Sequence, residues 1–323
     1  EYFKMDLRHM VRVDGTFMRA PQVMEENETF VIERDANGAL VKRWKDEHAT
    51  PHTLEHAIRS PHDWARAREN LAPDPRRFSF GYYGDYGYEY FSAALPEVAR
   101  AVAACPNFPE TYLIVSVLEP YEAAMRLLGD AALLLNMAED PEFVADLFTA
   151  QADFASGAVR MLLDAGVRPN GVFVGGDIAY KNGLLFSPRM YRELLFPQHQ
   201  RMFRQFHEWG LQVVYHSDGN FTAALPMLIE AGADAVQPLE VQAGMDLDEL
   251  AGAFGTQVSF MGNISVQALS GTKDEAVSEA RRKIRAGKRT RGYVFHSDHS
   301  VPPTVSLANY RAVMEVFEEV AWR

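Results

Sequence analysis

Short apolar runs alternate with longer amphipathic stretches from about residue 77 to the end of the chain. Seven of the runs have the length of β-strands, and most are apolar at consecutive positions, which is typical of strands buried on both faces. These runs cover residues 78–84, 111–117, 171–177, 211–217, 233–239, 258–263 and 292–297. Amphipathic patterns between the runs predict helices over residues 188–210, interrupted at Pro197, and over residues 221–232 and 273–287, which both end at a glycine.

The regular alternation of strand and helix predicts an α/β fold with a parallel sheet, and we expect it to close as a (β/α)8 TIM-type barrel. An open, doubly wound sheet is the alternative. An eighth strand is expected within residues 120–165, in the N-terminal part, or before the first residue. Because no Gly-rich phosphate loop opens a helix after the first strand, a dinucleotide-binding fold has little support. Because no linker rich in Gly, Ser or Pro divides the chain, we predict a single domain over residues 1–323, with the main barrel over residues 76–323.

Residues 1–75 are irregular and polar, and we predict that they form an N-terminal extension. Two alternating runs between Phe30 and Trp44 meet at Asn37-Gly38, a pair that accepts the positive φ angles of a tight turn, so they predict a β-hairpin. Residues 60–71 predict a capped helix with Pro61 near its start.

The chain of 323 residues carries 44 Asp and Glu against 32 Lys and Arg, which gives a formal net charge of −12. This acidic balance argues against binding to nucleic acid or to anionic membranes, because phosphate groups require a basic surface. The one dense basic stretch, residues 281–291, is interpreted as a solvated helix end and loop. With no apolar run of about eighteen residues, no signal-peptide pattern and a single cysteine, Cys105, the sequence leads us to expect a cytoplasmic protein.

Several predicted strands end in polar residues, and two of them end in the same His-Ser-Asp sequence. In a parallel barrel the carboxyl ends of all strands lie on one face, so these side chains are expected to converge. His216 and Asp218 have the spacing of a metal-binding pair, and Asp298 after the last strand would complete a site for zinc or another divalent metal. Two alternatives are open: a metal-free acid/base pocket, and aspartates that cap the following helices.

Other strand-end residues are candidates for catalysis or substrate binding. We assign Asp177, Glu240 and His299 to the catalytic set, in which a carboxylate or imidazole would orient the substrate or transfer a proton. The substrate-binding candidates at these strand ends and in the loops beside them are Tyr83, Asp85, Tyr180 and Asn263. The alternatives are a capping role for Asp177 and loop packing for the aromatic cluster around Tyr83.

The order and spacing of several stretches resemble the uroporphyrinogen decarboxylase superfamily over nearly the whole chain. These stretches are "EPYEAAMRLLGD", "GGDIAYKNGLLFSPRMYRELLFPQHQRM", "VYHSDGN", "EAGADAVQPLEVQAGMDLDEL", "VSFMGNISVQALSGTKDEAV" and "YVFHSDHSVPPTVSLANY". The resemblance implies a (β/α)8 barrel whose site lies at the C-terminal mouth, with Asn263 in the pocket wall.

The resemblance implies one of two chemistries. The decarboxylases of the superfamily act on porphyrinogens without a metal or an organic cofactor; this chain lacks their N-terminal Arg-rich motif, and Asp85 lies near the place of their key aspartate among residues that do not match. The corrinoid-linked methyltransferases hold zinc with an H-x-C motif and a distant cysteine. The resemblance puts His216 at the histidine, Asp218 at the first cysteine and Asp298 near the second, with His299 close by.

Both thiolates of that zinc site are therefore replaced, and carboxylate and imidazole ligands leave a harder, more Lewis-acidic metal. We predict a metal-dependent methyltransferase that moves a methyl group from a small oxygenated or methylated donor to a corrinoid on a partner protein. One alternative is a metal-free decarboxylase-like lyase that acts on a carboxylated small molecule and uses Asp85, Asp177 and His299 as acids and bases. The other is a non-catalytic binding barrel, and a homodimer is left open.

Overall fold

The computed structural model describes residues 6–45, 51–84, 87–104 and 111–320, without the side chains of residues 8–9 and 82–91. The chain forms two compact units, which are described separately. The N-terminal unit lies within residues 7–169 and 193–198, and the C-terminal unit within residues 170–192 and from residue 199 onward. Among the described residues, no helix is long and apolar enough to cross a membrane.

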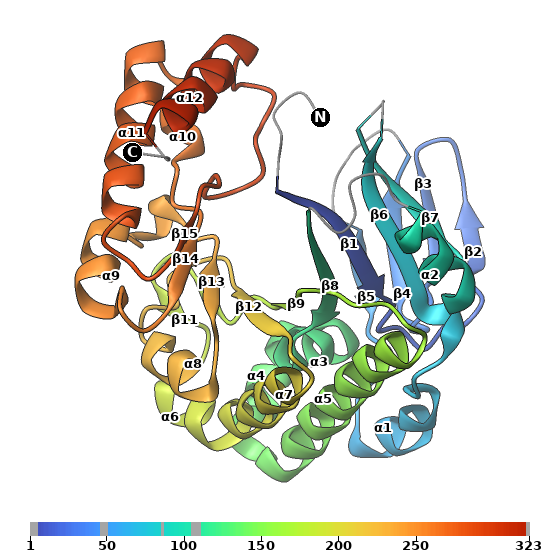
Figure 1. Ribbon diagram of the computed structural model, residues 1–323. Helices are drawn as coiled ribbons and strands as arrows, with labels where there is room; N and C mark the ends of the chain where they lie inside the picture. Colours follow the sequence, from blue (N-terminus) through green and yellow to red (C-terminus); the bar gives the residue numbers. More distant parts are fainter. Residues whose placement is uncertain (1–5, 46–50, 85–86, 105–110, 321–323) are drawn as a thin grey trace. The chain divides into compact units, whose positions relative to one another are not determined.

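A mixed sheet forms the centre of the N-terminal unit (Figure 1). Its strand order is β8–β1–β6–β7, with β1 (Leu7–Val13), β6 (Phe78–Gly84), β7 (Gly87–Ser92) and β8 (Tyr112–Leu118). β1 is parallel to β8 and antiparallel to β6, and β6 is antiparallel to β7. The predicted strand over residues 78–84 is confirmed, but its expected parallel pairing is wrong. Only two residues separate β6 from β7, whereas a parallel pair requires a crossover of about a dozen residues or more.

Within the described residues, a second sheet of four antiparallel strands contains the predicted hairpin. Its strands are β2 (Gln22–Glu26), β3 (Phe30–Arg34), β4 (Leu40–Trp44) and β5 (His52–Glu55). In the turn between β3 and β4, Gly38 has a positive φ of 89° and Asn37 does not. The Asp35 carboxylate accepts hydrogen bonds from the backbone N–H groups of Asn37 and Ala39, both at 2.9 Å. A side chain thus closes the turn that Asn-Gly was expected to form by its φ angles.

The helices of the N-terminal unit are α1 (Pro61–Ala67), α2 (Leu95–Ala103), α3 (Pro120–Leu128), α4 (Asp130–Glu139) and α5 (Pro141–Asp164), with short 3₁₀ turns η1 (Arg68–Asn70) and η2 (Pro75–Arg77). α1 begins as predicted, because the Ser60 hydroxyl accepts the backbone N–H of Asp63 at 3.2 Å and Pro61 lies in the first turn. The α-helix ends at Ala67, earlier than predicted, and η1 continues to Asn70.

In the described part of the C-terminal unit, five parallel strands lie in the order β15–β14–β13–β12–β9 (Figure 1). They are β9 (Gly171–Gly175), β12 (Gln212–His216), β13 (Ala235–Gln237), β14 (Ser259–Met261) and β15 (Tyr293–Val294). Each strand falls within a predicted run, and the parallel direction is confirmed. Their carboxyl ends therefore share one edge, where the loops carry the polar candidates. Closure of the strands into a barrel, like the single domain, stays a prediction.

Besides these parallel strands, the described chain after residue 178 contains two short strands, two short helical segments and seven α-helices. The short strands are β10 (Ala179–Tyr180) and β11 (Gly183–Leu184), and the short segments are the π-helix η3 (Tyr191–Leu195) and the 3₁₀ turn η4 (Val241–Ala243). The helices are α6 (Pro188–Met190), α7 (Phe196–Glu208), α8 (Leu225–Ala231), α9 (Leu247–Phe254), α10 (Val266–Ser270), α11 (Lys273–Gly287) and α12 (Leu307–Val320). The interruption predicted at Pro197 is confirmed, since η3 ends and α7 begins just before it, where a missing N–H is tolerated. α11 has its predicted bounds, with a capping box of Thr272 and Glu275 at its start.

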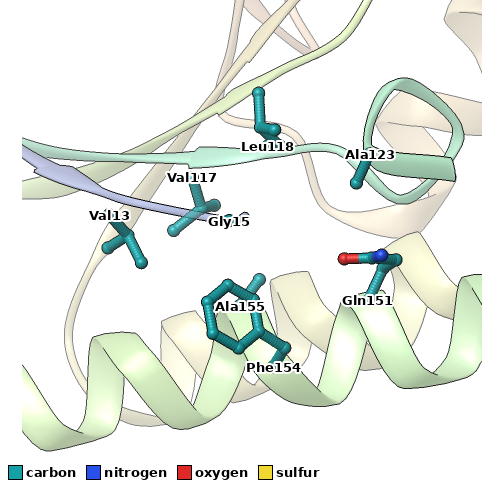
Figure 2. A pocket seen from close by; sticks show the side chains of 8 residues that line it. All are labelled: Val13, Gly15, Val117, Leu118, Ala123, Gln151, Phe154 and Ala155. Atoms are coloured by element: carbon teal, nitrogen blue, oxygen red, sulfur yellow. The ribbon is translucent and has the colours of Figure 1, made fainter. Parts of the chain in front are cut away.

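The N-terminal unit contains a small cavity (Figure 2). Its lining is mostly apolar and consists of Val13, Gly15, Val117, Leu118, Ala123, Gln151, Phe154 and Ala155. The centre of a water-sized sphere can occupy only about 10 Å³ of it, which is room for about one water molecule. A cavity of this size cannot hold an organic substrate.

Arg77 is a buried cation that ties three segments of the N-terminal unit together. Its side chain is 3% exposed. The guanidinium donates hydrogen bonds to the backbone carbonyls of Asp14 at 3.0 Å, Thr16 at 2.5 Å, Asn70 at 2.6 Å and Ala72 at 2.9 Å. A guanidinium offers five N–H donors in a fixed planar fork, which suits simultaneous bonds to four carbonyls better than the three donors of a lysine do.

We predict that Arg77→Met lowers the free energy of unfolding by about 3–5 kcal/mol, because several carbonyls lose their donor in the interior. Urea denaturation followed by circular dichroism would measure the change. Arg76→Met is the matched control: this neighbour is exposed, and its loss should leave the denaturation midpoint nearly unchanged. Equal losses in the two variants would contradict the role given to Arg77.

Candidate functional site

The carboxyl ends of β9, β12 and β13 lie side by side in the C-terminal unit. The register pairs Gly175 of β9 with His216 of β12, and His216 with Gln237 of β13. Asp177 follows Gly175 by two residues, and Asp218 follows His216 by two, so both carboxylates lie just beyond the edge of the sheet. Parallel pairing thus brings residues from distant parts of the sequence to one place.

Asp177, His216 and Asp218 form a group of metal-ligating type. Each offers one ligand atom, and these atoms lie within 4.8 Å of one another. The Nε2 atom of His216 is 3.6 Å from Oδ1 of Asp177. Two ligand atoms that share a tetrahedral zinc ion at about 2.1 Å lie about 3.4 Å apart, so this spacing fits a common ion. Three protein ligands with an open fourth position is also the arrangement of catalytic zinc sites, so the donor set fits a divalent metal of this kind.

The electrostatics of Asp218 also suit a cation. Burial raises the pKa of the half-buried Asp218 carboxyl, and the negative charges of Asp177 and Glu240 raise it further, against the opposing effects of His216 and His299. A carboxyl group whose ionised form is disfavoured by burial and by other carboxylates retains its proton more readily. A divalent cation would take the place of that proton.

Hydrogen bonds hold the backbone around Asp218 in place. The buried Ser217 hydroxyl accepts the backbone N–H of Ile178 at 3.2 Å and donates to the carbonyl of Asp218 at 2.8 Å. The Asp218 N–H donates to Oδ1 of Asp177 at 2.8 Å. The loops after β9 and β12 are therefore joined by both backbone and side-chain groups.

Gly219, in the loop after β12, makes contact with Glu240, the catalytic candidate that follows β13. Its φ is 76°, and a Cβ atom there would lie 2.7 Å from backbone atoms of Ala179 and Tyr180, so only glycine fits. Its N–H donates to Oε2 of Glu240 at 2.9 Å. Glu240, predicted as catalytic, is thus fixed near Asp218 by one of its two oxygens.

Asp298, predicted as a metal ligand, lies outside the group of three ligand atoms, and Asp177 stands in its place. The Asp298 side chain is 1% exposed, and its two oxygens accept the backbone N–H groups of Val241 at 3.2 Å and Val266 at 2.9 Å. Burial raises the pKa of this carboxyl. In this structure Asp298 ties together the loops after β13 and β14, and a ligand role for it stays a prediction.

Asn263, predicted to bind substrate, is fully buried. Its amide nitrogen donates to the carbonyls of Leu239 at 2.6 Å and Met245 at 2.5 Å. Its amide oxygen accepts the N–H of Leu247 at 3.0 Å and a short hydrogen bond from the Lys283 ammonium. Because every polar group of the side chain is used inside the protein, Asn263 holds the loop that carries Glu240 instead of contacting a substrate. This is a correction to the sequence-based assignment.

Four predicted site residues remain: Tyr180, His299, Tyr83 and Asp85. Tyr180 is 50% exposed in β10, and His299 is exposed in the loop after β15. Tyr83 belongs to β6, where its backbone pairs with Tyr88, and Asp85 lies outside the described residues. The roles of these four residues stay predictions.

Sequence reasoning missed Gln237, which accepts a short hydrogen bond at Oε1 from Nδ1 of His216. A single glutamine at the end of the apolar run "DAVQ" was the signal that could have found it. It also missed the Phe173 ring, whose centroid lies 5.4 Å from that of His216. No polar pattern marks Phe173, so only the packing of β9 against β12 identifies it.

The parallel strands, with metal-ligating side chains gathered at their carboxyl ends, define a class of α/β protein in which the site lies at the strand ends. The family profile described as "Uroporphyrinogen decarboxylase (URO-D)" matches residues 87–320, and the chain belongs to this family. It is therefore a member of an enzyme family.

Two known proteins are similar to this chain. A curated "Uroporphyrinogen decarboxylase" from Anaeromyxobacter sp. (strain Fw109-5) is 29% identical over 131 residues, which span 41% of this chain and only 36% of the relative. The solved structure of a "methyltransferase from Methanosarcina mazei" has a TM-score of 0.61 and 16% identity, covering 88% of this chain and 76% of that chain. The second likeness establishes the fold alone.

We predict that Asp177→Asn lowers the pKa of Asp218 in metal-free protein, because it removes a negative charge that disfavours ionisation. Burial, the largest cause of the raised pKa, is unchanged in this variant. Carbon-13 NMR titration of the carboxyl group would measure the pKa in wild type and variant. Glu230→Gln on α8, which removes an exposed carboxylate paired with Arg192, is the control and should not move the Asp218 titration. An unchanged pKa in Asp177→Asn would contradict the proximity of the two carboxylates.

Proposed function

We propose that this chain is a metal-dependent methyltransferase, which transfers a methyl group from a small oxygenated or methylated donor to a corrinoid on a partner protein. The observation that carries the proposal is the group of ligand atoms from Asp177, His216 and Asp218 within 4.8 Å. Its agreement with the H-x-C position of the corrinoid-linked branch, with Asp218 in place of cysteine, gives further support.

Each residue of the site has a role in this proposal. Asp177, His216 and Asp218 would hold the metal, which when bound supplies Lewis-acid activation of a donor oxygen. Nitrogen and oxygen ligands suit an oxygenated donor better than thiolate ligands do, because they leave the metal more Lewis-acidic. Glu240 keeps Oε2 on the Gly219 N–H, and its Oε1 would supply a proton to the donor oxygen that leaves when the methyl group is transferred.

The charge of the site favours a neutral or cationic donor over an anionic one. The carboxylates at these strand ends are Asp177, Asp218, Glu240 and Asp298, and within the described residues none of them forms an ion pair with Lys or Arg. Apart from the proposed metal, a substrate carboxylate placed beside them would meet like charges without a Lys or Arg partner in the described part of the chain. This argues against a polycarboxylated substrate such as a porphyrinogen.

A metal-free, decarboxylase-like lyase is the second candidate function. The family to which the chain belongs is named after a decarboxylase, and the raised pKa of Asp218 favours a carboxyl group that retains a proton it can donate. In that reaction Asp218 would protonate the carbon that loses carbon dioxide, with Asp177 and His299 as neighbouring acids and bases. Metal binding separates the two candidates.

We predict that untagged protein, reconstituted with Zn²⁺ and desalted, retains about one ion per chain, as measured by plasma mass spectrometry. His216→Ala and Asp177→Ala should each lose most of it, because two protein ligands hold zinc far less tightly than three. His299→Ala should retain it, since His299 is outside the group. Circular dichroism of each variant shows whether the fold survives.

Asp298→Asn distinguishes the ligand set in this structure from the set predicted by sequence. Retention of zinc in this variant supports Asp177 as the third ligand, and loss of zinc with the fold intact would support Asp298. If neither the wild type nor any variant binds a divalent metal, the proposed metal-dependent function fails, and the metal-free lyase becomes the favoured function. Carboxylated substrates would then be the ones to screen, with release of carbon dioxide as the measurement.

Activity tests the donor. Metal-loaded protein incubated with reduced cobalamin and small methyl ethers, alcohols or methylamines should produce methylcobalamin, which is followed by its visible absorbance. A protein that turns over only methylated thiols would contradict the inference from the oxygen ligands. His216→Ala should abolish the transfer in either case.

A further inference from the structure

We infer that Gln237 is a positioning residue for His216: it holds the imidazole as the tautomer that carries its proton on Nδ1, so that Nε2 presents a lone pair to the metal. The inference rests on the proposed metal site and adds to it a residue that is not itself a ligand. It also assigns the ligating atom of His216, which neither the sequence nor the family likeness specifies.

The sheet register places Gln237 where it can act. His216 and Gln237 are paired residues of the adjacent parallel strands β12 and β13, so their side chains leave the sheet on the same face. Oε1 of Gln237 is hydrogen-bonded to Nδ1 of His216. Gln237 is only 8% exposed, and water therefore has little access with which to replace the amide oxygen.

The other neighbouring strand restrains the face of the ring. Gly175 of β9 is the register partner of His216 on that side. The Phe173 ring lies against the imidazole, with a centroid separation of 5.4 Å and an interplanar angle of 31°. A Cβ atom at position 175 would lie 3.4 Å from Cε1 of Phe173 and 4.0 Å from Cδ2 of His216, which places this position beside both rings.

Phe173 contacts one face of the His216 ring and Gln237 contacts its Nδ1 edge, so the Nε2 edge is directed at the carboxylates. Nε2 lies 3.6 Å from Oδ1 of Asp177. An amide oxygen can only accept a hydrogen bond, so the contact with Gln237 requires the proton on Nδ1. Neutral imidazole has a single N–H, and Nε2 is then the unprotonated nitrogen. Hydrogen-bonded partners of this kind fix the tautomer and orientation of histidines that bind metals.

Nitrogen-15 NMR of the ring tests the assignment directly. In metal-free wild type at about pH 8.5, where an ordinary histidine is neutral, we expect His216 to show a protonated Nδ1 and an unprotonated Nε2. In Gln237→Leu, which keeps the approximate size but removes the acceptor, the proton should move largely to Nε2. Gln237→Glu, which keeps an accepting oxygen, should retain the wild-type tautomer. If Gln237 only supported the fold, Gln237→Leu would keep the wild-type tautomer.

Zinc affinity provides the second measurement. Gln237→Leu should weaken Zn²⁺ binding by about 10–100-fold in competition with a chromophoric chelator, and Gln237→Glu should bind at least as tightly as wild type. Wild-type protein with the proton on Nε2, or Gln237→Leu with an unchanged tautomer, would overturn the inference. The tautomer is measured without metal: if it depends on Gln237 but wild type binds no zinc, the positioning role stands and the proposed metal-dependent function fails.

Discussion

The pairing of β12 between β9 and β13 is the constraint on which the candidate site depends. It aligns Gly175, His216 and Gln237 in one row across three strands. The ladder continues past the strands, because the N–H of Gly176 donates to the carbonyl of His216 and the N–H of Ser217 donates to the carbonyl of Gln237, each at 3.1 Å. A shift of one residue in this register would turn His216 to the opposite face of the sheet. The position of His216 is thus a property of the backbone pairing.

Buried polar groups then fix the loops that follow the strands. Asp298 accepts backbone N–H groups from the loops after β13 and β14, and Asn263 joins the carbonyls of Leu239 and Met245. The fully buried Lys283 donates to Asn263 and lies 3.8 Å from Asp246, while desolvation lowers the pKa of its ammonium. Burying such polar groups costs free energy, and these hydrogen bonds offset that cost. These buried groups hold the loops in place, whereas Asp177, His216 and Asp218 are only half-buried.

The chemistry open to the site follows from its charge and ligand types. Asp177, Asp218 and Glu240 gather carboxylate charge at the strand ends, and the charges of Asp177 and Glu240 raise the pKa of Asp218. A divalent metal would neutralise part of that charge and supply the electrophile that the side chains lack. Membership in the family and the proposed methyl transfer are compatible, because one barrel-type scaffold carries different reactions on the loops at its strand ends.

The sequence by itself predicted the five parallel strands of the C-terminal unit and the bounds of α11. Apolar runs, helix caps and the capping box at Thr272 are local signals, and the His-Ser-Asp at the end of β12 suggested His216 and Asp218 as a ligand pair. The antiparallel direction of β6 and the inward turn of Asn263 came only with the tertiary structure. So did the place of Asp177 beside His216, where Asp298 was expected. These features depend on strand register and on contacts between residues far apart in the chain, and periodicity along a single sequence carries no information about either.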